Sequence, residues 1–249
     1  MTKVQVEGRN AVLELLKQGG LVREILVDEN ARIDKRLGRI FELAEQQGVR
    51  VIKKPRRALD ELSFTGEHMG IIASANAPQL PTRLIDVIEE CDRKKVDPFL
   101  VLIPEIQHRQ NLGAIIRTAN AAGVHAIVLS RGTESVFSPE VTRISMAANF
   151  FTPVIRMSTY SAIKMLKTHG ISIIGADASG KIPYFEVNMK GAVTLCLGSE
   201  GKGLSEEFMR RCDYVVNIPM VGMVSSLNVS VSFGILVYEK VRQERILGS

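Results

Sequence analysis

Serine, asparagine and glycine residues gather at three points of this chain, each following an apolar stretch, where they could bind a ligand. At the most informative point, a predicted strand 213–218 ends at Pro219, and the serine-rich segment 225–232 then opens the last predicted helix, 226–246. Serine and asparagine often cap helix starts, where free backbone N–H groups point outward. The segment therefore predicts a site that binds a polar ligand through its backbone.

The second point follows the predicted strand 99–103. Asn111 is expected to cap a helix over 112–122, and Arg117 lies about two turns further on, near the apolar face of that helix. Open α/β sheets bind ligands at the carboxyl ends of their strands, which is where this stretch falls. An arginine that reaches out to water and one that serves a ligand both fit the pattern.

The third point is the sequence Gly-Ser-Glu-Gly-Lys-Gly at 198–203, directly after the predicted buried strand 193–197. A phosphate-binding P-loop has its lysine after the last glycine, followed by Ser or Thr. Here Lys202 precedes Gly203, and Glu200 would repel a phosphate. The spacing also differs from the G-x-G-x-x-G of dinucleotide sites. An ordinary tight turn is the alternative, but a carboxylate between glycines at the ligand edge of a sheet favours a functional loop.

The elements that position these points divide into two α/β units. Residues 1–77 form a small first unit, 78–97 a linker that begins with prolines, and 98–249 a second unit with a mostly parallel sheet, because its strands are apolar throughout. The elements expected in the first unit and linker are helices 10–17, 33–47, 58–62 and 84–91 and strands 25–27, 49–52 and 70–75. Those expected in the second unit are strands 99–103, 126–129, 153–156, 171–175, 193–197 and 213–218 and helices 112–122, 160–168, 205–211 and 226–246.

Composition is that of a globular protein, with 45% hydrophobic residues. The polar start of the chain lacks the apolar core of a signal peptide, and no apolar run reaches the length of a membrane span. Three cysteines lie far apart without metal spacing, which is typical of a reducing compartment. We therefore expect a cytoplasmic protein without a metal or a membrane partner.

The net charge of +5 is compatible with a nucleic-acid partner. The densest basic cluster is 53–57 (Lys-Lys-Pro-Arg-Arg), and 93–95 is the next. Either cluster alone is typical of a solvated surface. Aromatic residues make up only 5% of the chain, so an RNA partner would be recognised by shape and phosphates more than by stacked bases.

Taken together, three motifs resemble the SPOUT superfamily of RNA methyltransferases, and more closely its TrmH-type family of ribose 2'-O-methyltransferases. The motifs are N-L-G-x-x-x-R-T-A at 111–119, G-S-E-G-K-G at 198–203, and I-P-M followed by S-L-N-V-S-V within 218–231. Their order and spacing fit the family, and the resemblance extends over essentially the whole chain.

The resemblance implies that the second unit is a trefoil-knotted domain whose C-terminal helix passes through a loop, which departs from the usual absence of knots. It implies S-adenosylmethionine as the cofactor, held in a bent shape largely by backbone groups, and a homodimer formed through the knotted domains. The cofactor-binding residues expected from the family are Ala176, Leu197, Gly198, Ile218, Met220 and Leu227.

In the family, the arginine that matches Arg117 is proposed to help activate the ribose hydroxyl. Because a guanidinium is a very weak base, we expect Arg117 instead to stabilise the developing alkoxide and to anchor a neighbouring phosphate. The other expected catalytic residues, which would orient Arg117, the ribose and the methionine end of the cofactor, are Asn111, Glu200, Ser226 and Asn228.

The first unit is similar to the small RNA-binding domain found at the front of the family's ribosomal RNA members. The likeness rests on Gly8-Arg9-Asn10 and on a turn at 68–70. The expected RNA-binding residues are Arg9, Asn10, Lys53, Lys54, Arg56 and Arg57.

The chain departs from the family at one place. Many relatives carry Asp-Pro shortly before the motif asparagine, where this chain has His108-Arg109. Because Asn111 and Arg117 are intact, activity is expected to be kept, while the loop geometry or the target nucleotide could change.

The leading interpretation is an enzyme that methylates the ribose of a guanosine in large-subunit ribosomal RNA, and a transfer RNA target is the alternative within this class. Two other classes stay open: a catalytically inactive RNA-binding protein of the same fold, and a phosphate- or nucleotide-binding enzyme. The intact Asn111, Arg117, Glu200 and Asn228 argue against the first, and the position of Lys202 argues against the second.

Overall fold

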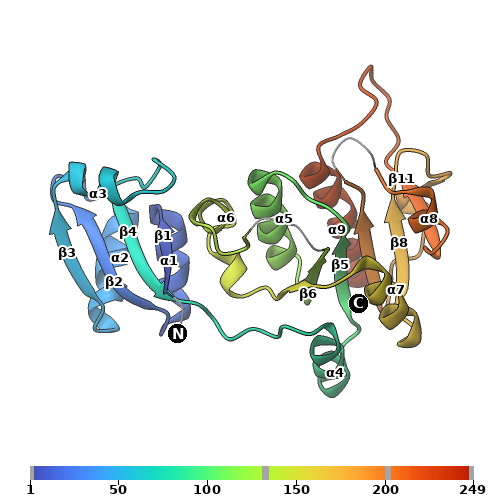
Figure 1. The fold of residues 1–249 in the computed structure, drawn as a ribbon, viewed down its shortest axis with the longest axis horizontal. Helices are drawn as coiled ribbons and strands as arrows, with labels where there is room; N and C mark the ends of the chain where they lie inside the picture. The colour runs from blue at the N-terminus through green and yellow to red at the C-terminus, as the bar shows by residue number, and fades with distance from the viewer. Residues whose placement is uncertain (1–2, 131–134, 200–202, 247–249) are drawn as a thin grey trace. The chain divides into compact units, whose positions relative to one another are not determined.

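The chain folds into two compact units, seen in a computed structural model that describes residues 3–130, 135–199 and 203–246 (Figure 1). Met1–Leu80 and Ser135–Phe151 make up unit 1, and Pro81–Glu134 and Thr152–Ser249 make up unit 2. The sequence patterns give no indication that 135–151 packs with the first unit.

Unit 1 contains a mixed four-stranded sheet in the order β1-β4-β2-β3, in which only β2 and β3 are parallel. Its elements are β1 (Lys3–Glu7), α1 (Arg9–Gln18), β2 (Val22–Asp28), α2 (Lys35–Gln46), β3 (Arg50–Lys54), α3 (Arg56–Leu62), β4 (Ile71–Asn76), α6 (Pro139–Ile144) and the 3-10 turn η1 (Ala148–Phe150). The expected set lacks β1, α6 and η1.

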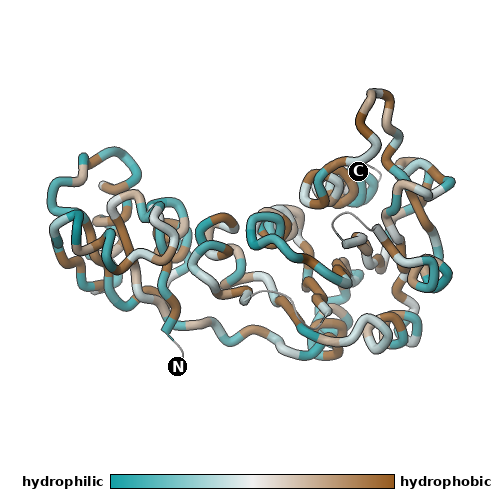
Figure 2. Tube along the Cα trace, turned by 45° about the horizontal axis from the view of Figure 1, so that its top comes forward, coloured by the Kyte–Doolittle hydropathy of each residue, from teal (hydrophilic) through white to brown (hydrophobic). Residues whose placement is uncertain are grey.

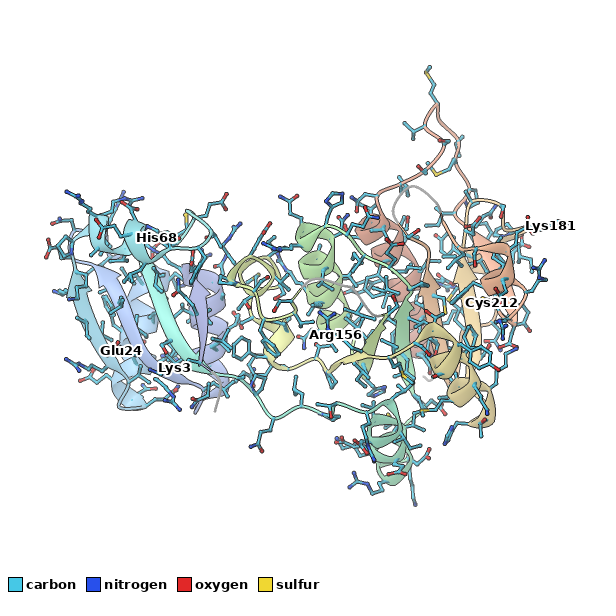
Figure 3. All side chains as sticks on the ribbon, viewed as in Figure 1. Lys3, Glu24, His68, Arg156, Lys181 and Cys212 are labelled. Atoms are coloured by element: carbon cyan, nitrogen blue, oxygen red, sulfur yellow. The ribbon has the colours of Figure 1, made fainter. Side chains whose placement is uncertain are left out.

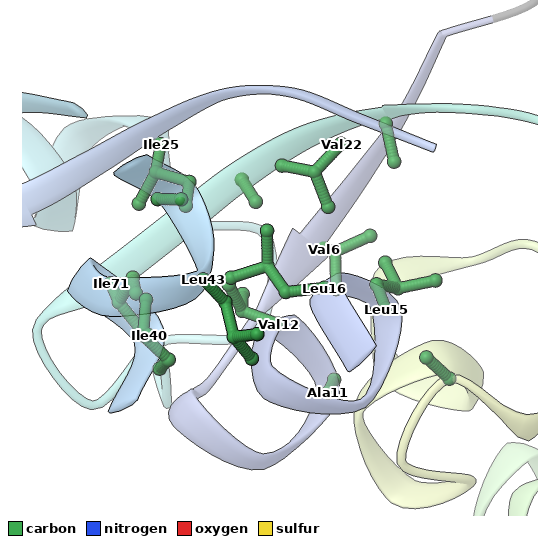
Figure 4. Close-up of a cluster of buried hydrophobic side chains, with 14 of the residues drawn as sticks. Val6, Ala11, Val12, Leu15, Leu16, Val22, Ile25, Ile40, Leu43 and Ile71 are labelled. Atoms are coloured by element: carbon green, nitrogen blue, oxygen red, sulfur yellow. The ribbon is translucent and has the colours of Figure 1, made fainter. Parts of the chain in front are cut away.

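The core of unit 1 lies between one face of this sheet and helices α1 and α2. In β1, Val4 and Val6 point into the core while Lys3 and Gln5 point away, as expected for a strand with one buried face. Figure 4 shows the resulting cluster, in which Ile40 and Leu43 of α2 pack with residues of α1, β1, β2 and β4. The 3-10 turn joins this cluster from outside the first 80 residues through Ala147 and Phe150.

Glu7 is a fully buried carboxylate at the end of β1 and is surrounded by donors. It accepts hydrogen bonds from the backbone N–H of Phe64, the hydroxyls of Ser63 and Thr65, and the amide of Gln5. Burial raises the pKa of Glu7, but these hydrogen bonds outweigh it and hold the pKa below its ordinary value of 4.5. The ionised carboxylate therefore fixes the 63–65 turn against β1.

We expect Glu7→Gln to destabilise unit 1 by about 2–3 kcal/mol, because the new amide group would face donors that need an acceptor. The native pKa is lowered, so the stability from Glu7 is complete above pH 4.5 and is lost as the pH falls through the native pKa. Hydrogen exchange of peptides from β1 and β4 of the full chain should show this acid loss in the wild type and a flatter profile in Glu7→Gln. Equal profiles would refute the assignment, and Glu14→Gln, at a partly exposed position of α1, is the control.

Unit 2 contains an entirely parallel seven-stranded sheet in the order β7-β6-β5-β10-β8-β11-β9. This confirms the expected parallel α/β domain. Its strands are β5 (Phe99–Ile103), β6 (Ala126–Leu129), β7 (Val154–Arg156), β8 (Ser172–Ala176), β9 (Ile182–Pro183), β10 (Val193–Leu197) and β11 (Tyr214–Asn217). Its helices are α4 (Leu84–Lys94), α5 (Arg109–Ala121), α7 (Thr159–Thr168), α8 (Glu206–Met209) and α9 (Val229–Ile246), with a 3-10 turn η2 (Tyr184–Glu186).

Helices cover both faces of this sheet, which is why β5 and β10 are buried at every residue. Helices α4, α7 and α8 share one apolar cluster with the sheet, and α5 and α9 pack side by side over the other face (Figure 1). Gly175 of β8 lacks a side chain where a Cβ would lie 2.9 Å from Cys212 Sγ and 2.9 Å from Leu204 Cδ1. The glycine thus lets the loop around Cys212 (Figure 3) pack directly on the strand.

Candidate functional site

The candidate site is a cavity of about 360 Å³ at the carboxyl ends of β8, β10 and β11, closed on one side by the segment that precedes α9. This is the edge at which open α/β sheets bind ligands, and the volume suits a small organic molecule. The residues that line it are Ala176, Asp177, Ala178, Leu197, Gly198, Ser199, Gly203, Val216, Ile218, Met220, Ser225, Ser226, Leu227, Val229 and Ser232. All six residues expected to bind the cofactor are among them.

Two glycines allow the backbone to pack tightly around this cavity. A Cβ on Gly198 would lie 2.3 Å from the carbonyl carbon of Gly203, and one on Gly180 would lie 2.6 Å from the carbonyl carbon of Val216. Real Cβ atoms do not approach backbone atoms this closely. The loop after β10 can therefore close on itself, and the loop after β8 can pack on β11, only with glycine at these positions.

The glycine-rich loop after β10 closes on itself. The backbone N–H of Ser199 donates to the carbonyl of Gly203 at 3.0 Å, and the N–H of Gly203 donates back to Ser199 at 3.1 Å. Gly203 has a φ of 66°, which suits glycine. Glu200 and Lys202 lie outside the described residues, so the role expected for Glu200 remains a prediction.

Helix α9 begins at Val229, three residues later than expected, and Asn228 is the residue that precedes it. Asn228 Oδ1 accepts hydrogen bonds from the N–H of Ser230 at 2.8 Å and from its hydroxyl at 2.7 Å. The expectation that the helix opens at Ser226 is thus wrong. Ser226 and Leu227 line the cavity ahead of the helix, because the Asn228 side chain, and not a serine, caps it.

Asn111 is not the cap of α5, contrary to expectation. That helix begins at Arg109 after His108, so Asn111 lies within its first turn. There its Oδ1 accepts a hydrogen bond of 3.1 Å from Asn228 Nδ2, which joins the starts of α5 and α9. Two of the expected catalytic residues, 117 positions apart in sequence, are therefore in direct contact.

We expect Asn228→Asp to separate the two roles of this side chain. The carboxylate still caps α9, but it removes the donor to Asn111, so thermal stability should hold while kcat falls about tenfold, the effect of about 1.4 kcal/mol. Asn228→Ala should lose both the helix cap and the hydrogen bond to Asn111, and should cost about 1 kcal/mol of stability. Thermal melts and methylation rates check this. Because the Asn111 amide can turn and donate to a carboxylate, Asn111→Ala is measured beside it, and a wild-type rate in that variant would rule out a role for the contact.

Arg117 lies on the exposed side of α5 and does not line the cavity. No hydrogen bond or ion pair joins it to any residue that the structure describes. Its guanidinium is thus available to a ligand that docks from outside. Of the other expected catalytic residues, Ser226 lines the cavity and Asn111 and Asn228 adjoin it.

Asp177 is a cavity residue that the motifs do not include. Its Oδ2 accepts a hydrogen bond from the N–H of Leu204 at 2.9 Å, and its Oδ1 accepts one from the hydroxyl of Ser179 at 2.7 Å. It directly follows β8, whose carboxyl end belongs to the ligand edge of a parallel sheet. That position is the signal that could have singled it out.

Most of the residues expected to bind RNA form an exposed basic surface at one end of the sheet in unit 1. Lys53 and Lys54 end β3, Arg56 and Arg57 begin α3, and all four are exposed. The N–H of Glu29, at the end of β2, donates to the carbonyl of Lys54 at 2.9 Å. The two parallel strands thus end together, beneath the basic residues.

Arg9 and Asn10 belong to the same end of the sheet in unit 1. Arg9 is engaged, because it pairs with Asp34 at 2.9 Å and donates to the carbonyl of Met69 at 3.1 Å. Asn10 is exposed beside it. The neighbouring turn is held by His68 (Figure 3), a buried histidine whose Nδ1 accepts from Gly70 N–H and whose Nε2 donates to Asp60. Arg9 therefore also braces the turn that the family resemblance singled out.

No group of three or more His, Cys, Asp or Glu residues with metal-binding geometry occurs among the described residues. In the same part of the chain, no helix is both long and apolar enough to cross a membrane.

Comparison with protein families gives matches over both units. The SpoU rRNA Methylase family matches residues 98–238, and the family described as RNA 2'-O ribose methyltransferase substrate binding matches residues 5–81. The 23S rRNA (guanosine-2'-O-)-methyltransferase RlmB of Escherichia coli K12 is 33% identical over 241 residues, which cover 96% of this chain and 98% of that protein.

Solved structures of RNA methyltransferases superpose on nearly the whole chain. The crystal structure of an RNA 2'-O ribose methyltransferase superposes with a TM-score of 0.83 and 26% identity, covering 97% of this chain and 89% of that one. The SpoU methyltransferase AviRb from Streptomyces viridochromogenes, in complex with the cofactor AdoMet, superposes with a TM-score of 0.74 and 27% identity, covering 97% of this chain and 90% of that one.

Proposed function

Since the chain belongs to the SpoU rRNA methylase family, we propose that it methylates the 2'-hydroxyl of a guanosine ribose in 23S ribosomal RNA. The observation that carries the proposal is the near full-length similarity to an enzyme of that name, together with a cavity lined by every expected cofactor residue. A transfer RNA target is the alternative within the same chemistry.

The chain is an RNA ribose 2'-O-methyltransferase and uses S-adenosylmethionine, which confirms the class and the cofactor expected from the motifs. The cavity fits this cofactor. Apolar side chains of Leu197, Ile218 and Leu227 can cover the adenosine, and the close-packed glycine loops expose backbone groups to its polar atoms. We assign cofactor binding to Ala176, Leu197, Gly198, Ile218, Met220 and Leu227.

The bound cofactor supplies an electrophilic methyl group on a sulfonium, and the chain must make a ribose hydroxyl nucleophilic. We propose that Arg117 does so by stabilising the negative charge that develops on the 2'-oxygen as its proton leaves to water, and by holding an adjacent phosphate. Asn111 and Asn228 fix α5 against the start of α9, which sets the position of Arg117 relative to the cavity. Ser226 and Glu200 would orient the ribose and the methionine end of the cofactor.

We propose that unit 1 binds the RNA substrate through its basic surface of Lys53, Lys54, Arg56 and Arg57, next to Arg9 and Asn10. The match of residues 5–81 to a substrate-binding family supports this. Arg57 is 91% exposed and pairs only with Glu61 among the described residues, while Lys53 and Lys54 have no acidic partner there. Such cations can exchange their counterions for phosphates.

We expect Lys53→Glu/Lys54→Glu to weaken RNA binding by at least about tenfold at low salt and to reduce the slope of log affinity against log salt by about two. Binding of S-adenosylmethionine should not change. Filter binding over a salt series measures both quantities. Lys94→Glu/Lys95→Glu, in the other basic cluster, is the matched control, and an equal effect of the two double variants would contradict a specific surface.

A homodimer is part of the proposal. The segment between β11 and α9 forms a protruding loop (Figure 2). It carries exposed apolar residues, since Val221 is 99% exposed and Met223 fully so. On α9 itself, Val231 and Tyr238 are half-exposed. A second copy of the chain would cover such a surface. Light scattering should give twice the mass of 27.4 kDa, and a monomer at micromolar concentration would refute this.

The knot and the cellular location are also proposed. The trefoil knot requires α9 to pass through a loop of unit 2, and an experimental structure in which the chain does not thread would overturn it. A cytoplasmic location follows from a ribosomal RNA substrate in bacteria, and cell fractionation tests it.

The target is tested by incorporation of labelled methyl groups into RNA from cells that lack this gene. Label in purified 23S RNA and not in transfer RNA is the expected result. Label in transfer RNA alone would keep the chemistry and replace the proposed substrate.

A further inference from the structure

Asp177 places a negative charge in the wall of the cofactor cavity. The three hydrogen bonds to its carboxylate come from the N–H of Leu204, the N–H of Ser179 and the hydroxyl of Ser179, all of them neutral donors. Burial raises the pKa of Asp177, but these bonds outweigh it and lower the pKa below its ordinary value, so the carboxylate is ionised at neutral pH.

No cation of the protein neutralises this charge within the described part of the cavity. Its described lining contains no lysine, arginine or histidine, and Asp177 forms no ion pair there. A charge in such a partly enclosed site, next to apolar walls, interacts more strongly with a bound ligand than it would in open water. The charge of the described lining is therefore negative, which favours a ligand that carries positive charge.

The two ligands that must occupy this cavity in turn differ by one positive charge. S-adenosylmethionine and its product S-adenosylhomocysteine share an ammonium and a carboxylate, and only the substrate has a sulfonium. When the methyl group leaves for the ribose oxygen, the sulfur keeps the bonding electron pair and becomes a neutral thioether, while the hydroxyl proton goes to water.

We propose that Asp177 makes the cavity select S-adenosylmethionine over S-adenosylhomocysteine by charge, so that the product binds more weakly once the methyl group is gone. The inference rests on the assignment of this cavity to the cofactor made above. It assigns to Asp177 a specificity role that the sequence motifs do not contain.

A purely structural role is the competing explanation, because Asp177 also clasps the glycine loop. A Cβ on Gly203 would lie against Asp177 Oδ2, at 2.4 Å, and the same oxygen holds Leu204 N–H. Loosening this contact would weaken the binding of both ligands alike, since they share every group except the methylsulfonium centre. The ratio of the two affinities therefore separates the explanations.

The test is isothermal titration of the full-length protein with each ligand. In Asp177→Asn, the Kd of S-adenosylmethionine should rise about tenfold more than that of S-adenosylhomocysteine, the scale of a partly screened charge interaction. Sinefungin, which carries an ammonium in place of the sulfonium, should follow the substrate. Glu206→Gln is the matched control, because it removes one negative charge from an exposed helix outside the cavity.

The wild type provides a second measurement that does not depend on a variant folding. Because salt screens charges, the preference for S-adenosylmethionine over S-adenosylhomocysteine should shrink as sodium chloride rises from about 0.05 to 0.5 M. Equal losses for all three ligands in Asp177→Asn, or a preference independent of salt, would overturn the inference. If the wild type bound neither substrate nor product, the cofactor assignment itself would fail instead.

Discussion

Replacement of Arg117 by alanine should lower kcat by about 10²–10³-fold, the usual effect of removing one donor that stabilises a developing oxyanion. The Kd of S-adenosylmethionine should stay within about twofold of the wild type, because Arg117 does not line the cavity. The split is expected because the side chain is exposed on α5 and does not line the cavity. Single-turnover methylation and cofactor titration measure the two quantities.

The conservative variant adds a second readout. Arg117→Lys keeps a positive charge but loses the planar pair of donors, so it should recover only part of the rate. Arg210→Ala, which removes an exposed arginine from the end of α8, controls for the loss of charge. Parallel loss of cofactor binding and turnover in Arg117→Ala would show that the residue supports the fold of the cavity instead.

Gly198→Ala, which adds a single methyl group, should weaken binding of the cofactor markedly. The added Cβ would lie 2.3 Å from the carbonyl carbon of Gly203 and 2.6 Å from the nitrogen of Leu204, both backbone atoms that cannot turn aside. The two arms of the loop must separate, at a cost of about 1–3 kcal/mol. We therefore expect the Kd of S-adenosylmethionine to rise about tenfold to a hundredfold.

Gly222→Ala is the matched control because it lies in the segment between β11 and α9, which also lines the cavity, and a Cβ there would meet nothing within 4 Å. It should bind the cofactor as the wild type does. Titration of both variants with S-adenosylmethionine measures the two affinities, and thermal melts show whether the folded fractions are comparable. An unchanged affinity in Gly198→Ala would mean that the close approach of the two loop arms does not shape the site.

The sheet of unit 2 and the cavity at its edge were predictable from the sequence, because fully apolar strands such as 193–197 and glycine-rich loops carry strong local signals. The loop of Gly198 follows β10, and the segment from Ile218 to Leu227 follows β11 and leads into α9. They meet because the carboxyl ends of parallel strands lie at the same edge of the sheet. The family resemblance then supplied the chemistry, which the residues alone left open.

Strand β1 and helix α6 were missed for different reasons. The alternation of Val4 and Val6 is a strand signal, but over five residues it is short and lies in a polar start of the chain. Helix α6 has a clear start, with Ser138 as its cap and Pro139 after it. Nothing in the sequence indicates that this segment packs into the core of unit 1, because the rest of that core lies far away along the chain.

The helix starts at the site show the limit of local signals. Asn111 and Ser226 were expected to open helices α5 and α9, and instead His108 and Asn228 precede them. Any of several polar residues in a row can cap a helix, and tertiary contacts such as that between Asn111 and Asn228 decide which one does. Asp177 was missed because a single carboxylate forms no recognisable motif, and only the fold shows that it lines a cavity.

The most direct test of the account is to map the product by nuclease digestion and mass spectrometry after methylation of ribosomal RNA from cells that lack the gene. We expect one 2'-O-methylguanosine in 23S RNA, formed by the wild type and absent with Arg117→Ala. A methyl group on a base, or a ribose methyl that Arg117→Ala still forms at the wild-type rate, would contradict it.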